Sequence, residues 1–199
     1  ELDRWVPRRL DEVRACGAPQ LGPPRGGTLA SPRAAPGPAE AWIGAALPRS
    51  REARAAGQVL AAMLDGDGVL TAPLAGLVRE RSARVVGGRE ASAIVVRLVA
   101  PEGTLDAAVD KTRAALAQLR AGAFDEQTAE QAFQRLVRAR EARRADPVAR
   151  LIELVGDEPL AARPSLEQLK EHAKETFRDD ALVLVGERRK GAPDAPSKR

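Results

Sequence analysis

Hydrophobic positions along the chain change several times between a spacing of two residues, typical of strands, and a spacing of three to four, typical of helices. Segments with the shorter spacing, together with short apolar runs, predict strands. In chain order these are 28–34, 40–47, 84–86, 91–100 and 181–185. The turn-forming segments Pro36-Gly37-Pro38 and Gly87-Gly88 separate the members of each predicted pair.

Segments with the longer spacing predict helices, and an amphipathic stretch at 2–13 predicts a further helical arm that Pro7 would kink or end. The predicted helices are 51–64, 72–82, 105–121, 126–143, 147–155 and 166–177. Most of them follow a residue that commonly caps a helix N-terminus. These capping residues are Ser50, Thr104, Asp125, Asp146 and Ser165. Ser165 is followed three residues later by Gln168, which is the pattern of a capping box.

The order of these elements places strands in pairs and helices in runs, which is typical of α+β folds and not of alternating βαβ units. We therefore expect an antiparallel sheet with helices packed mainly on one face. The run 91–100 is apolar on both of its faces, so we expect a central strand with cover on each side. The folded domain is predicted at 28–187, between an interdomain arm and linker at 1–27 and a flexible tail at 188–199. Because the chain opens at Glu1 instead of Met, we expect a processed chain or a piece of a longer one.

Composition narrows the possible functions. Aromatic residues make up only 3% of the chain, so we expect a core of Ala, Val, Leu and Ile, and a function based on aromatic stacking is not favoured. The formal net charge of +4 comes from 32 basic and 28 acidic residues that are interleaved along the chain. Interleaving favours a mixed solvated surface over a nucleic-acid-binding face. No apolar run approaches the roughly 18 residues needed to span a membrane.

Several short motifs occur in a characteristic order. They are Ala41–Pro48, Val59–Gly68, Leu74–Arg81, Pro101–Gly122, Phe124–Thr128, Ser165–Lys170, Thr176-Phe177 and Val183–Gly186. Their order and spacing resemble one domain of the pitrilysin-like (inverzincin) metallopeptidases, which include the mitochondrial processing peptidase. The resemblance covers residues 28–187 and implies the α+β domain of that family, from the cytoplasm or periplasm of a bacterium.

The zinc motif of that family is not present. Active members bind zinc through a His-x-x-Glu-His helix motif and a more distant glutamate. The single histidine of this chain lies in His172-Ala-Lys-Glu175-Thr176, where threonine stands at the position of the second ligand, at the wrong end of the domain. Catalytic zinc requires about three protein ligands. The resemblance therefore implies a C-terminal-type half with no catalytic residue and no metal of its own. It places zinc in a homologous partner domain, upstream in the same chain or in a separate subunit.

The resemblance also identifies candidate substrate-binding residues. In two-domain members the C-terminal half contributes an arginine and, seven residues later, a tyrosine. The corresponding positions here are Arg79 and Val86, so half of that pair is missing. The alternative for Arg79 is an ordinary surface or helix-terminal ion pair. Gly66 and Gly68 match the family's glycine loop and are expected to line the substrate, with a plain helix-breaking turn as the alternative.

We therefore expect a domain that encloses and positions a peptide substrate against its zinc-bearing partner. A scaffold or interaction protein derived from a peptidase is one alternative. A second, less favoured alternative is a binder of nucleic acid or of an anionic surface that uses the arginine-rich segment Arg135–Arg144. Affinity for DNA that falls steeply with salt is expected only of this last alternative.

Overall fold

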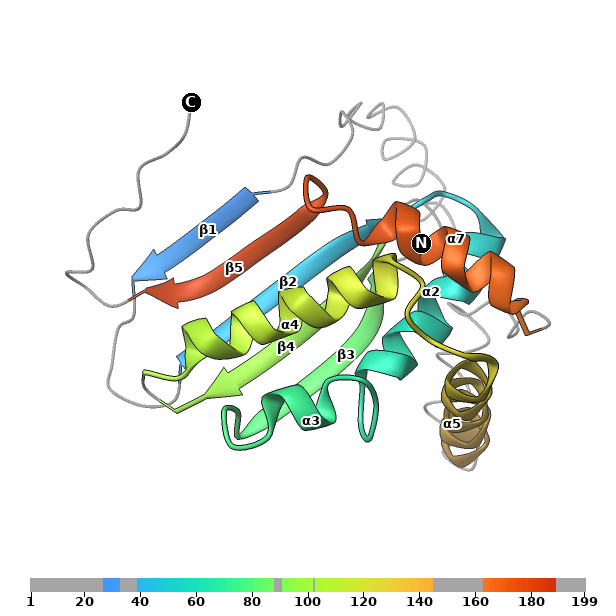
Figure 1. Cartoon of the computed structure of the whole chain (residues 1–199), viewed down its shortest axis with the longest axis horizontal. Coiled ribbons are helices and arrows are strands. Elements are labelled where there is room, and N and C mark those ends of the chain that lie inside the picture. The colour runs from blue at the N-terminus through green and yellow to red at the C-terminus, as the bar shows by residue number, and fades with distance from the viewer. Residues whose placement is uncertain (1–26, 33–38, 88–90, 102, 145–162, 189–199) are drawn as a thin grey trace, which may run out of the picture.

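The computed structural model describes residues 27–32, 39–87, 91–101, 103–144 and 163–188. The strands are β1 (Gly27–Pro32), β2 (Ala39–Leu47), β3 (Glu80–Gly87), β4 (Ser92–Ala100) and β5 (Leu182–Arg188) (Figure 1). The helices are α2 (Arg51–Leu64), α3 (Thr71–Leu74), α4 (Leu105–Arg120), α5 (Glu126–Arg144) and α7 (Leu166–Thr176). The predicted arm at 2–13, the linker that follows it, the helix at 147–155 and the tail lie outside the described residues.

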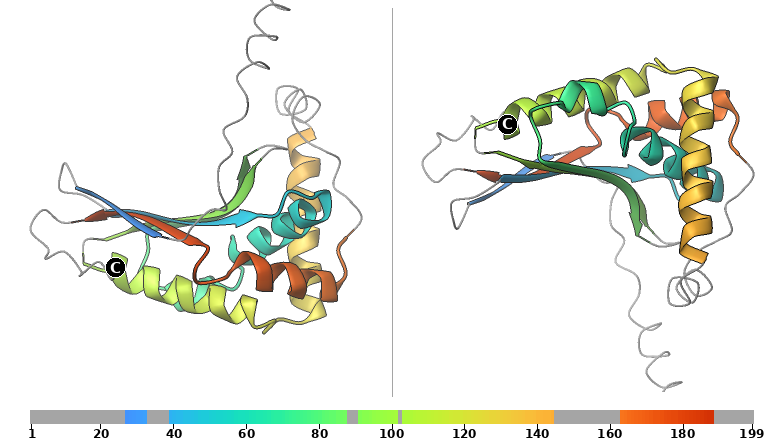
Figure 2. Two further views of the ribbon diagram at one scale, coloured as in Figure 1. Left: turned by 90° about the horizontal axis from the view of Figure 1, so that it is seen from above. Right: turned by 90° about the horizontal axis from the view of Figure 1, so that it is seen from below.

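The strands form one five-stranded sheet in the order β1-β5-β2-β4-β3. The pairs β5–β2, β2–β4 and β4–β3 are antiparallel, whereas β1 runs parallel to β5. Figure 2 shows that α2, α4 and α7 lie on one face of this sheet, and that α5 stands across its end beyond β3. The prediction of an α+β fold with an antiparallel sheet and helices mainly on one face is confirmed.

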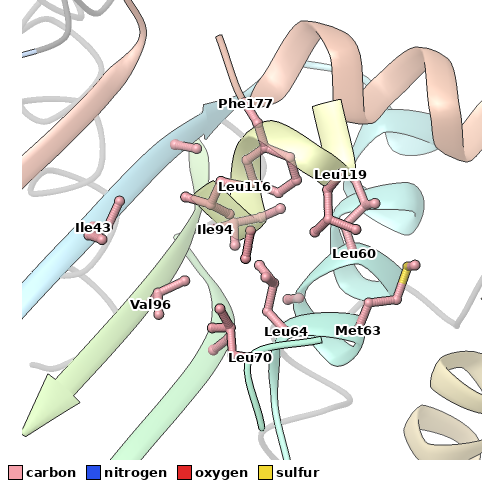
Figure 3. Close-up of a cluster of buried hydrophobic side chains, with 14 of the residues drawn as sticks. Ile43, Leu60, Met63, Leu64, Leu70, Ile94, Val96, Leu116, Leu119 and Phe177 are labelled. Atoms are coloured by element: carbon pink, nitrogen blue, oxygen red, sulfur yellow. The ribbon is translucent and has the colours of Figure 1, made fainter. Parts of the chain in front are cut away.

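The core lies between the sheet and the helices on that face. Alternate residues of β2 point into it and are buried, and the same period holds in β4 as far as Leu98. Figure 3 shows Ile43, Ile94 and Val96 pointing from the sheet toward the helices. The side chains that they face include Leu64 of α2, Leu116 of α4 and Phe177, which directly follows α7. Apart from Phe124 and Phe177, the buried hydrophobic residues are aliphatic side chains and Met63. A core built from small and branched aliphatic residues therefore compensates for the scarcity of aromatic ones.

The prediction of a helix at 72–82 is wrong. Helix α3 is a single turn that ends at Leu74, and strand β3 begins at Glu80. Gly76 has a φ of 74°, in the left-handed region, which ends the helical path soon after α3. The Arg79 amide then donates to the Val99 carbonyl (2.7 Å), at the point where β3 meets β4. Pairing with β4 along the whole of β3 outweighs the local helical spacing of the sequence.

Most of the predicted helix caps are found. The Ser50 hydroxyl accepts from the Ala53 amide (3.0 Å), and Asp125 accepts from the Thr128 amide (2.8 Å) at the start of α5. Ser165 and Gln168 form the predicted capping box of α7. Thr104 stands at the predicted N-cap position of α4 but makes no side-chain capping bond, because its hydroxyl is directed to the carbonyls of Leu77 (2.9 Å) and Pro101 (3.0 Å).

Strand β4 is internal, as its two apolar faces predict, but the described helices cover only one of them. Ile94, Val96 and Leu98 are buried against the helices. On the opposite face Val95 is only partly buried, whereas Val99 near the end of the strand is buried. Among the described helices, none lies on that second face (Figure 2). None of them is both long enough and apolar enough to cross a membrane.

Candidate functional site

The loop after α2 carries the two glycines predicted to line the substrate. Gly66 has a φ of 53°, which favours glycine, and a Cβ there would meet no atom within 4 Å. Gly68 is enclosed instead, because a Cβ would lie 2.0 Å from the Met63 carbonyl oxygen. The local backbone geometry of the turn is therefore sufficient to explain both glycines, and a role in substrate binding stays a prediction.

The loop is fixed to strand β3 by side-chain hydrogen bonds. The Asp65 carboxylate accepts from the Ala83 amide (3.2 Å), and the Arg81 guanidinium donates to the Thr71 hydroxyl (2.7 Å). Arg81 also donates to the Gly66 carbonyl, as does Thr71 (3.1 Å). The Asp65 bond satisfies a backbone donor on the free edge of β3, which would otherwise have no strand to pair with.

Arg79 lies immediately before β3 and is exposed. Val86, at the position of the family's tyrosine, lies near the other end of the same strand. Seven residues of extended chain separate Cα atoms by roughly 23 Å, so the two positions do not converge on one point. Arg79 and Gly66 do not share a site either. Gly66 borders a cavity next to β3, and Arg79 is not among the residues that line this cavity.

That cavity, of about 460 Å³, lies between α2, β3 and α5. Its charged lining consists of arginines from all three elements and one aspartate, Asp65. The arginines are Arg54, Arg84, Arg135 and Arg140. Sequence analysis singled out the arginine-rich segment of α5 but gave no reason to group it with α2 and β3, because only the fold brings the three together.

The second notable surface is the sheet face opposite the helices. The register places Trp42 between Val185 and Arg97, and Gly44 between Val183 and Val95. These valines and Trp42 are partly buried. They form a surface that we term the open face, defined by Trp42, Gly44, Val95, Val183 and Val185. It is apolar at the centre of the sheet, where no described helix covers it.

A row of charges borders the open face. Arg97 pairs with Glu40 on β2 (2.5 Å) and with Glu80 on β3 (3.4 Å), so that the row crosses three strands. The hydrogen bond to Glu40 raises the pKa of the Arg97 guanidinium above its already high ordinary value. Arg97 therefore stays charged at any physiological pH. The row gives the open face an apolar centre with a polar margin, which is the usual layout of a surface that contacts another molecule.

No metal centre is formed by the residues that the structure describes: no three histidine, cysteine, aspartate or glutamate side chains gather in a position to hold an ion. His172 is half-buried on α7, and Glu175 on the same helix is exposed. Among the described residues, no third potential ligand lies with His172 and Glu175.

Comparison with known proteins gives matches in structure but not in sequence. Neither a protein-family model nor a curated protein sequence matches the chain. A protein assigned as an M16-like peptidase, from Alicyclobacillus acidocaldarius, superposes with a TM-score of 0.64 at 18% identity, over 82% of this chain and 43% of the other. The inactive domain of an M16 peptidase from Pseudomonas fluorescens gives 0.63 at 15% identity, over 89% and 47%.

A third match corresponds to a single domain. The inactive peptidase domain of a protein assigned as a zinc protease, from Bordetella parapertussis, gives a TM-score of 0.64 at 17% identity, over 77% of this chain and 94% of that domain. The chain thus spans less than half the length of the longer matches and nearly all of the isolated domain. The chain has the fold of a pitrilysin-like (M16) peptidase domain, of the kind found in the inactive domains of that group.

Proposed function

We propose that this chain is the non-catalytic half of a pitrilysin-like zinc metallopeptidase, which encloses a peptide and positions it against a zinc-bearing partner domain. The observation that carries the proposal is the open face, an apolar surface on a fold shared with inactive peptidase domains. A sheet that packs helices on one side and leaves apolar residues on the other has a surface available for a second molecule.

The two halves would divide the work of catalysis. Zinc in the partner domain would activate a water molecule for attack on the peptide bond. This chain would exclude solvent from the peptide and hold it in alignment, which lowers the entropic cost of reaching the transition state. Its own contribution to the rate would come from rigid positioning, since the loop 65–68 and strand β3 are held together by hydrogen bonds.

The test is to express this chain alone and together with the domain encoded upstream of it. We expect stoichiometric zinc only in the preparation that contains the upstream domain. We also expect cleavage of an unfolded-peptide library only when both parts are present. The matched control is the same pair with glutamine in place of the glutamate of the partner's His-x-x-Glu-His motif, which should bind zinc and cleave nothing.

Other outcomes contradict the proposal. Zinc and activity in this chain alone would show that it is itself an enzyme. A partner that is fully active without this chain would remove its role in positioning the peptide. An upstream domain that has no zinc motif, with both preparations inactive, would favour the scaffold alternative.

A further inference from the structure

The arginine-lined cavity has a feature that packing of the fold does not require. Arginine side chains from α2, β3 and α5 converge on one hollow, and Asp65 is the one acidic residue among the described residues of its lining. The Asp65 carboxylate is already engaged by the Ala83 amide (3.2 Å). Guanidinium groups brought close together repel one another, and an anion bound between them offsets that repulsion. The cavity is therefore suited to a negatively charged group.

Two of these arginines have N–H donors that no described group accepts. Arg84 is exposed, and within the described part of the chain it has no hydrogen bond or ion pair. Arg135 donates to the Ala62 carbonyl (3.0 Å), while its Nε is buried with no hydrogen-bond partner among the described residues. Arg54 and Arg140 also line the cavity, and each makes an interaction of its own.

The rest of the lining favours a carboxylate on a flexible aliphatic stem. The apolar part of the lining consists of small or aliphatic residues, namely Ala61, Ala62, Ala83, Val85, Leu136 and Ala139. Such a lining can accommodate the methylene groups of an acidic side chain, and the planar guanidinium binds a carboxylate through two parallel hydrogen bonds. Among the described residues that line the cavity none is aromatic, so they offer no platform for stacking nucleic-acid bases.

The position of the cavity connects it to the open face. Strand β3 is the edge strand, and its register with β4 puts Ser82 and Arg84 on the same side of the sheet as Val95. Ala83 and Val85, on the other side, line the cavity as well. The cavity therefore extends around the edge of the sheet, and a chain lying on the open face could reach it.

We propose that this cavity binds the side-chain carboxylates of an acidic peptide segment that passes from the open face around the edge of β3. That this segment is part of a peptidase substrate rests on the function proposed above. Binding itself does not, since it requires only the residues of this chain.

The experiment measures binding to the full 199-residue chain by fluorescence anisotropy. The probes are a labelled ten-residue peptide with glutamate at alternate positions and the same peptide with glutamine in its place. We expect the glutamate peptide to bind at least about tenfold more tightly, since hydrogen bonds to charged groups are among the stronger ones. Arg84→Gln is expected to weaken it about tenfold without affecting folding, because Arg84 is exposed and has no described partner.

Arg138→Gln is the matched control. Arg138 is exposed on α5 but does not line the cavity, and the substitution removes the same charge. Binding by this variant should change less than about twofold. Arg135→Gln should weaken binding in the same way as Arg84→Gln, provided that its thermal unfolding shows a folded protein.

Three results would overturn the proposal. The first is equal affinity for the glutamate and glutamine peptides. The second is an equal loss in the Arg84 and Arg138 variants, which would indicate diffuse attraction by the whole surface. The third is displacement of the glutamate peptide by inorganic phosphate at lower concentration than by free glutamate, which would indicate a phosphate site. None of these readouts involves the zinc-bearing partner, so peptide binding can succeed or fail independently of the proposed function.

Discussion

Gly68 closes the turn that follows α2, where the surrounding backbone leaves no room for a side chain. The resemblance made it a candidate for contact with substrate, whereas the structure shows that any side chain would collide with the Met63 carbonyl oxygen, 2.0 Å from the Cβ position, and with the Asp65 carbonyl oxygen, 2.7 Å away. A glycine can be recognised in a sequence, but the atom that a Cβ would meet depends on the completed turn. The need for glycine was predictable here, and the reason for it was not.

We expect Gly68→Ala to destabilise the fold more than Gly66→Ala. The left-handed backbone of Gly66 makes alanine unfavourable by about 1–2 kcal/mol, yet space is available for its methyl group. At Gly68 the backbone itself must move, which disturbs the loop that holds Asp65 against β3. Urea unfolding of the two variants measures the difference. A smaller loss for Gly68→Ala than for Gly66→Ala would show that the loop relaxes easily.

Asp125 gives a pH-dependent contribution to stability at the start of α5. Hydrogen bonds from the Thr128 hydroxyl (2.7 Å) and amide (2.8 Å) hold the pKa of its carboxyl below the ordinary value. A folded-state pKa below the unfolded one stabilises the fold above the ordinary value of about 3.9. That stabilisation is lost as the pH falls through the lowered value.

The test compares wild type with Asp125→Asn, which keeps an acceptor for the Thr128 amide but cannot be charged. We expect wild type to have the higher urea midpoint at pH 6 and the gap to close on acidification below about pH 4. Measurements at constant ionic strength from pH 3 to pH 6 test this. A gap that stays constant over that range would show that the charge of Asp125 is not the source of the difference.

At the scale of the element, sequence signals were most reliable where a side chain acts on its own backbone. The caps at Ser50, Asp125 and Ser165 are local interactions, and each lies where the sequence predicted it. The segment 72–82 was misassigned because its conformation depends on pairing with another strand, β4. Its residues from Glu80 onwards pair with β4, and a helical spacing of apolar residues carries no information about such a partner.

Helix α7 offers a direct measure of one such local signal. In its capping box the Ser165 hydroxyl accepts from the Gln168 amide (3.2 Å), and the Gln168 side chain accepts from the Ser165 amide (2.9 Å). Ser165→Ala should lower the free energy of unfolding by about 1 kcal/mol. Glu167→Ala on the exposed side of the same turn is the control and should change it by less than about 0.5 kcal/mol. Equal losses in the two variants would mean that the cap contributes nothing specific.

At the scale of the whole molecule, the fold class was predictable and the sheet order was not. Paired strands and runs of helices indicate an α+β domain without fixing which strands become neighbours. The first and last described strands, β1 and β5, lie side by side and parallel, although most of the domain separates them in sequence. The arginine-lined cavity has the same origin, since Arg84 and Arg135 are far apart in the chain and meet only through tertiary packing.

The open face provides the last prediction. Val95 lies at its centre, between Gly44 and Arg84 in the register, and is partly buried. If the partner half contacts this face, Val95→Lys should weaken association with the zinc-bearing domain by at least about tenfold, because burying an unpaired ammonium group is costly. The stability of the isolated chain should change little, since no described helix packs there. Analytical ultracentrifugation of the pair and thermal unfolding of the single chain measure the two effects.

Ala114→Lys is the control for this prediction, because Ala114 is exposed on α4, on the helical side of the sheet, and the substitution adds the same charge. It should affect neither association nor stability. A large loss of stability in isolated Val95→Lys would mean that the chain itself fills the open face, which would leave no apolar surface for a partner. Unchanged association of a stable Val95→Lys variant would place the partner elsewhere on the molecule. Only weakened association of a stable variant is compatible with an open face that joins the two halves around a peptide.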